Sequence, residues 1–133
     1  MKWYNKSSMF QLVIIGLGGS LGAICRFLVS KYAASLFQPF PMGTLLVNVV
    51  GSFILAFISY SVLSGRNIPT DVRSFASIGF IGAFTTMSTF SYETMRFLDQ
   101  GEYGYFAMNV GLNIFLCFIA IELGRYCALL LSK

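Results

Sequence analysis

Residues 79–91 read GFIGAFTTMSTFS and lie in the middle of a segment that is otherwise apolar enough to form a membrane helix. Gly79 and Gly82 weaken a helix, and the hydroxyl residues that follow can bond to their own backbone instead of continuing it. The stretch therefore favours an interrupted helix, with a regular helix containing Ser/Thr back-bonding as the alternative. A broken backbone at membrane depth is tolerated only where protein buries it or a cavity wets it. Its free carbonyls form a negative pole that suits a small cation.

The composition of the whole chain points to lipid as its solvent. Of its 133 residues, 56% are hydrophobic and 11% are charged, whereas soluble domains have about 45–50% apolar and about 25% charged residues. A crossing needs roughly 20 apolar residues, so this length allows about four crossings. We predict an all-α, multi-pass protein of the cell (inner) membrane. Its single domain, residues 1–133, has helices at about residues 9–28, 43–63, 72–98 and 103–131.

The charged and reactive residues exclude several function classes. The net charge of +4 is spread along the chain, so no basic run indicates a nucleic-acid partner. The sequence has no histidine, which removes the commonest general base and metal ligand. Cys25, Cys117 and Cys127 match no metal-site spacing and are interpreted as buried structural thiols. We expect no enzymatic activity.

Small and polar residues inside the apolar segments indicate where helices meet. Gly18 and Gly22 form a small-xxx-small pair, which predicts close packing against another helix. Asn48 lies about one turn inside its segment, and it either bonds to another helix or donates to an anion in a pore. Asn109 and Asn113 share one helix face, which fits a hydrated track or an interhelical ladder equally well.

Met87 and Phe90 are three residues apart and share a face, with Ser88 and Thr89 beside them. By periodicity alone an aromatic at this spacing favours packing. A ring presented edge-on can also contact an anion, because its edge carries partial positive charge.

The basic residues predict an orientation. Lys2, Lys6, Arg66, Arg73 and Lys133 lie on the side of the termini, whereas Lys31 is opposite, with Arg26 and Arg96 less clearly so. This bias favours both termini in the cytoplasm.

Taken together, these residues resemble the Fluc (CrcB) family of fluoride channels. The resemblance runs through all the predicted helices, and its motifs are Gly19-x-x-Gly22-Ala23-x-x-Arg26, Gly43-Thr44-Leu45-x-x-Asn48-x-x-Gly51-Ser52-Phe53, Gly79-Phe80-x-Gly82-x-x-Thr85-Thr86-x-Ser88-Thr89-Phe90 and Asn109-x-x-x-Asn113. The third motif is long and unusual, which makes the resemblance specific.

The resemblance implies a dual-topology antiparallel dimer with two fluoride pores. It implies that Asn48 donates hydrogen bonds to fluoride, that Phe90 presents its ring edge, and that Ser88 and Thr89 line a polar track. Asn113 falls at a pore-lining position and Arg26 at a vestibule position. The carbonyls of Gly82 and Thr85 resemble the family's structural sodium ion site at the dimer centre.

Two features depart from the family pattern. Met87 stands where the family usually has phenylalanine, and a thioether lacks a ring's positive edge. The charge bias favours one orientation, whereas a dual-topology protein should show little. Some relatives pair two different chains of opposite orientation, so the expected partner is either a second antiparallel copy or a homologous chain.

The function expected from these residues is passive, fluoride-selective efflux that gives fluoride resistance. One alternative is a small dual-topology multidrug/proton antiporter, for which Glu93 is the only plausible membrane-embedded carboxylate. Another is a membrane subunit that transports nothing itself.

Overall fold

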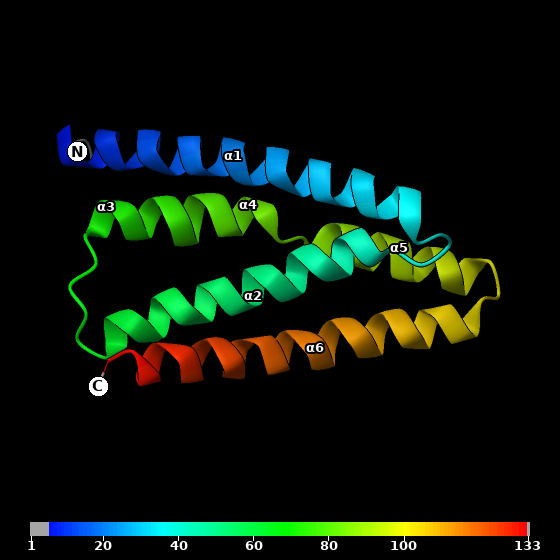
Figure 1. Ribbon diagram of the computed structural model, residues 1–133. Coiled ribbons are helices and arrows are strands. Elements are labelled where there is room, and N and C mark those ends of the chain that lie inside the picture. Colours follow the sequence, from blue (N-terminus) through cyan, green and yellow to red (C-terminus); the bar gives the residue numbers. More distant parts are fainter. Residues whose placement is uncertain (1–5, 133) are drawn as a thin grey trace, which may run out of the picture.

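The computed structural model describes residues 6–132 and is helical over that range apart from short connections (Figure 1). Three helices are long: α1 (Lys6–Leu36), α2 (Met42–Leu63) and α6 (Tyr103–Leu130). The part of the chain between α2 and α6 is divided into shorter pieces, which are α3 (Thr70–Arg73), the π-helix η1 (Ser74–Ile81), α4 (Gly82–Phe84) and α5 (Met87–Asp99).

The long helices have the properties of membrane spans. Ser8–Leu36, Met42–Leu63 and Tyr103–Leu130 are each long and apolar enough to cross a bilayer. The fourth predicted crossing, residues 72–98, corresponds to η1, α4 and α5, and its interruption keeps each piece short. The prediction of an all-helical, multi-pass membrane protein with a break in the third segment is confirmed.

The predicted helix limits hold for α2 and α6, which differ from residues 43–63 and 103–131 by one residue at one end. The expected end of the first helix near Leu28 was wrong, because α1 continues to Leu36. Lys31 and Ser35 lower the hydropathy without breaking the helix, and Ser35 Oγ donates to the carbonyl of Tyr32 at 2.7 Å. Helix α1 ends just ahead of Pro39, which disfavours helical geometry in the residue before it.

Two close helix pairs build the bundle. Helix α2 packs along α6, and α1 packs along η1 (Figure 1). The second pair depends on glycines: a Cβ at Gly79 would lie 2.6 Å from the carbonyl oxygen of Ile15 and 3.1 Å from the Cα of Gly18. A Cβ at Gly22 would overlap the backbone carbonyl of Phe80. The predicted close packing at Gly18 and Gly22 is therefore confirmed.

The beginning of α1 and the end of α6 lie at the same end of the bundle (Figure 1). Near that end, the Arg66 guanidinium donates to the carbonyl of Leu131 and ties the α2–α3 connection to α6. Lys2 and Lys133, which contribute to the predicted charge bias, lie outside the described residues.

Candidate functional site

The break in the third segment falls at two threonines. Helix α4 ends at Phe84, and its C-cap Thr85 is extended (φ −79°, ψ 157°). The next residue, Thr86, is also extended (φ −150°, ψ 112°) and is the N-cap of α5. Its hydroxyl accepts a hydrogen bond from the N–H of Thr89 at 3.2 Å. Side-chain capping of this kind satisfies one of the amides that a helix start leaves unpaired.

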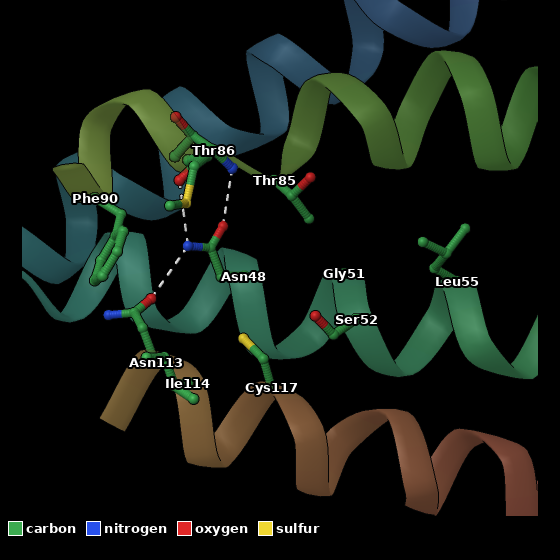
Figure 2. A pocket seen from close by; sticks show the side chains of 11 residues that line it. Asn48, Gly51, Ser52, Leu55, Thr85, Thr86, Phe90, Asn113, Ile114 and Cys117 are labelled. Carbon is green, nitrogen blue, oxygen red and sulfur yellow. Dashed lines mark hydrogen bonds between the residues drawn. The ribbon is translucent and has the colours of Figure 1, made fainter. Parts of the chain in front are cut away.

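Asn48 of α2 bridges this break. Its Oδ1 accepts a hydrogen bond from the N–H of Thr86 at 2.8 Å, and its Nδ2 donates to the carbonyl of Thr86 at 3.2 Å (Figure 2). In a continuous helix the N–H of Thr86 would bond to the carbonyl of Gly82. The asparagine thus takes the place of the missing helical turn and frees the Gly82 carbonyl from that partner.

A cavity of about 380 Å³ opens beside this bridge. It is formed where α2, the start of α5 and α6 meet (Figure 2). Most of its wall is apolar, and its polar groups come from two amides, hydroxyls and a thiol. The lining residues are Asn48, Gly51, Ser52, Leu55, Thr85, Thr86, Met87, Phe90, Asn113, Ile114 and Cys117.

Gly51 brings the break close to α2. A Cβ at this position would overlap the Cγ2 methyl of Thr85 and lie 3.5 Å from the Phe84 ring. The absence of a side chain therefore lets Thr85 and Thr86 approach α2 closely enough for the hydrogen bonds to Asn48. Three of the other predicted pore residues, Met87, Phe90 and Asn113, also line the cavity.

Ser88 and Thr89, whose hydroxyls are predicted to line a polar track, lie outside the cavity wall in the single chain. The hydroxyls of Ser88 and Thr89 lie 3.3 Å and 2.9 Å from the Thr86 hydroxyl. They form a polar cluster at the N-terminus of α5, and neither residue lines the cavity. Both side chains are exposed.

Two further predicted residues also lie outside the cavity wall. The first is Gly82, which is exposed one helical turn before the break. Thr85, its expected partner at the sodium site, does border the cavity. Arg26 is half-buried on α1 and is not among the lining residues. Within residues 6–132, no cluster of acidic or thiol side chains is arranged to hold a metal ion.

Three lining residues with hydroxyl or thiol groups were not identified from the sequence as part of a site: Ser52, Thr86 and Cys117. Ser52 follows Asn48 by four residues and Cys117 follows Asn113 by four, so helical spacing from the asparagines could have found both. The interpretation of the cysteines as buried thiols was wrong, because all three are partly exposed and Cys117 borders the cavity.

Glu93 lies in a different cavity, of about 330 Å³, at the opposite end of the bundle from the start of α1. That cavity is also lined by Arg96 and Thr44. The two cavities share no lining residue.

Comparison with known proteins gives one consistent result. The model of the family described as CrcB-like protein, Camphor Resistance (CrcB), matches residues 13–125. A Campylobacter lari protein named fluoride-specific ion channel FluC is 46% identical over 115 residues, which cover 85% of this chain and 93% of the relative.

Two archaeal proteins extend the comparison. A FluC from Methanococcus maripaludis is 46% identical over 117 residues, covering 88% of this chain and 94% of the relative. FluC 1 from Methanosarcina acetivorans is 38% identical over 124 residues, covering 93% and 95%. The match includes the helix break and both cavity asparagines, and the chain therefore belongs to the CrcB family of membrane proteins.

Proposed function

We propose that this chain forms a fluoride-selective channel that lets fluoride leave the cytoplasm passively and so gives fluoride resistance. The observation that carries the proposal is the Asn48 amide, which is held at a helix break beside a cavity within the membrane-spanning part of the fold. The names of the relatives, all fluoride-specific channels, point the same way.

The chemistry of the cavity suits a small anion. An anion loses its water shell on entering a narrow pore and needs replacement donors, which amides and hydroxyls supply. We assign the donor role to Asn48 and a place in the pore wall to Asn113, with Phe90 presenting the positive edge of its ring. Met87 occupies the other ring position of the family motif and completes the wall without an aromatic edge.

The functional unit we propose is an antiparallel dimer with two pores. Met87 is 72% exposed in the single chain, and the polar Ser88 and Thr89 next to it are exposed as well. Hydroxyls at membrane depth face protein or water rather than lipid. A second copy in the opposite orientation, or a homologous chain, would cover this face and make Ser88 and Thr89 part of the polar track.

A structural sodium ion at the dimer centre is the second part of this proposal. The carbonyls of Gly82 and Thr85 would hold it, and both lose a helical partner at the break: the N–H of Thr86 bonds to Asn48, and that of Thr89 bonds to Thr86 Oγ1. A bound sodium ion supplies the positive charge that such free carbonyls favour. We assign Arg26 to the vestibule, where its charge would attract anions.

Fluoride efflux from proteoliposomes, followed with a fluoride electrode, tests the channel. Asn48→Asp places a negative charge at the proposed donor, and Phe90→Ile removes the ring edge, so both should abolish or greatly slow the efflux. Matched controls are Asn67→Asp in the α2–α3 connection and Phe10→Ile near the start of α1, which should keep wild-type rates. Both controls are exposed and lie outside the cavity wall.

Three outcomes would contradict the proposal. Unchanged efflux in both cavity variants would remove the pore assignment. Chloride flux as fast as fluoride flux would remove the selectivity, and flux that required a proton gradient would indicate an antiporter. If the chain alone is inactive, the same assay with a homologous partner chain separates a heterodimer from a subunit that does not transport.

A further inference from the structure

The Asn48 amide has no free hydrogen in this structure. Its Nδ2 donates to the carbonyl of Thr86 at 3.2 Å and to Oδ1 of Asn113 at 3.1 Å (Figure 2). An amide nitrogen carries two hydrogens. An anion that binds Asn48 must therefore displace one of these oxygens. The Thr86 carbonyl is backbone within the break, whereas the Asn113 oxygen belongs to a side chain that lines the cavity.

The direction of both amides is fixed by backbone groups. The N–H of Thr86 can only donate, so Asn48 must turn its Oδ1 toward it. The carbonyl of Asn109 can only accept, and Nδ2 of Asn113 donates to it at 3.0 Å. Turning Asn113 over would place two donors against each other at Asn48. The Asn113 oxygen therefore points at Asn48 because of what holds the other end of its amide.

Asn109 fixes the direction of the Asn113 amide from a position outside the cavity. Its Oδ1 accepts a second hydrogen bond from Nδ2 of Asn113, at 3.1 Å. Its own Nδ2 donates to the hydroxyl of Thr94 at 2.9 Å, and that hydroxyl donates to the carbonyl of Phe90 at 2.7 Å. Asn109 is fully buried, with 0% of its surface exposed, and it does not border the cavity. Of the two interpretations of Asn109 and Asn113, these bonds support the ladder.

We propose that the Asn113 oxygen occupies the anion's place at Asn48 in the empty pore and that fluoride exchanges with it. Asn109 is the positioning residue that sets how readily the Asn113 oxygen leaves Asn48. This inference rests on the proposed channel function. The partial negative charge of an amide oxygen makes it a suitable substitute for an anion at a donor group. Removing it takes away a competitor, so fluoride should bind more tightly and not more weakly.

The concentration dependence of fluoride flux tests this competition. Asn113→Leu should lower the half-saturating fluoride concentration by about two- to tenfold, the equivalent of one neutral hydrogen bond. Asn109→Leu should shift it in the same direction by less, because the backbone carbonyl of residue 109 still holds Asn113. The double variant should match Asn113→Leu alone, since Asn109 acts only through Asn113. The control Asn67→Leu should leave the concentration dependence unchanged.

Results that differ from these expected shifts can be told apart. A half-saturating concentration that rises or stays constant in Asn113→Leu overturns the proposal, because Asn113 would then be a donor to fluoride or a bystander. Shifts of Asn109→Leu and Asn113→Leu that simply add would make Asn109 a structural residue. If the wild-type chain and its partner carry no fluoride at all, the channel function itself is wrong.

A second measurement does not depend on variants that fold. Solid-state NMR of wild-type protein with ¹⁵N-labelled asparagine side chains, in bilayers with sodium fluoride or sodium chloride, reports each amide separately. Fluoride should shift the amide signals of both Asn48 and Asn113 and leave that of Asn67 in place. A shift at Asn48 with Asn113 unmoved would overturn the exchange, and no shift at either would count against an anion at this cavity.

Discussion

The contact between α1 and η1 gives a sharp prediction, because α1 contains two glycines in opposite surroundings. A Cβ at Gly16 meets no atom within 4 Å in the described part of the chain. A Cβ at Gly22 would lie 2.9 Å from the carbonyl carbon and 3.1 Å from the Cα of Phe80, and even closer to its oxygen. Alanine at both positions is the same chemical change in the same helix.

The magnitude follows from two opposing effects. Glycine to alanine inside a helix stabilises by about 0.8–1 kcal/mol. Overpacking typically costs about 1–3 kcal/mol, and the upper end applies at Gly22 because the atoms it meets are backbone and a whole helix must move. Gly16→Ala should therefore gain about 1 kcal/mol and Gly22→Ala should lose about 2 kcal/mol. The propensity cancels in the comparison, so the two variants should differ by about 3 kcal/mol.

The assay is the free energy of unfolding in lipid-detergent micelles titrated with dodecyl sulfate, for wild type and both variants at equal protein concentration. Fluoride flux provides a second readout, because α4 and the break follow directly after the contact with Gly22. If Gly22→Ala were as stable as Gly16→Ala, α1 would not be seated on the η1 backbone, and the packing described above would be wrong.

Three further predictions concern the cavity. Thr86→Val removes the cap of α5 and should cost about 1 kcal/mol of unfolding free energy in the same titration, whereas Thr86→Ser keeps the hydroxyl and should stay close to wild type. Met87→Phe restores a ring edge and should raise fluoride flux without raising chloride flux; a slower rate would contradict the assigned ring role. A thiol-reactive methanethiosulfonate should block flux through Cys117, and Cys117→Ser should resist it while Cys127→Ser stays sensitive.

Much of the architecture could be predicted because apolar length is a direct property of the sequence. The limits of α2 and α6 and the interruption near Thr85 follow from hydropathy and from the glycine and threonine pattern. The end of α1 could not be predicted from hydropathy, because hydropathy measures how much of a helix lies in lipid and not where its hydrogen bonds stop. The π-helical form of η1 had no signal in the sequence that we identified.

The site was predictable in its members more than in its contacts. Asn48, Asn113 and Phe90 do meet at one cavity. The bonds of Ser88 and Thr89 to Thr86 were missed because capping depends on the exact residue at which a helix restarts. It also could not be anticipated that both hydrogens of the Asn48 amide are already bonded, because those bonds depend on the relative positions of α2, α5 and α6.

The wide turns of η1 determine how the helical part that follows them is rotated about the helix axis. A π-helix bonds each residue to the fifth one along, so its turns hold more residues than α-helical turns. A Cβ at Gly18 would meet backbone atoms of both Phe75 and Phe80 across the interface in this geometry. If the same residues formed ordinary α-helical turns of about 3.6 residues, each residue would advance farther around the helix axis, and the downstream part would be rotated relative to the upstream part. Such a helix would keep its seat at Phe75 or its alignment with Asn48, but not both.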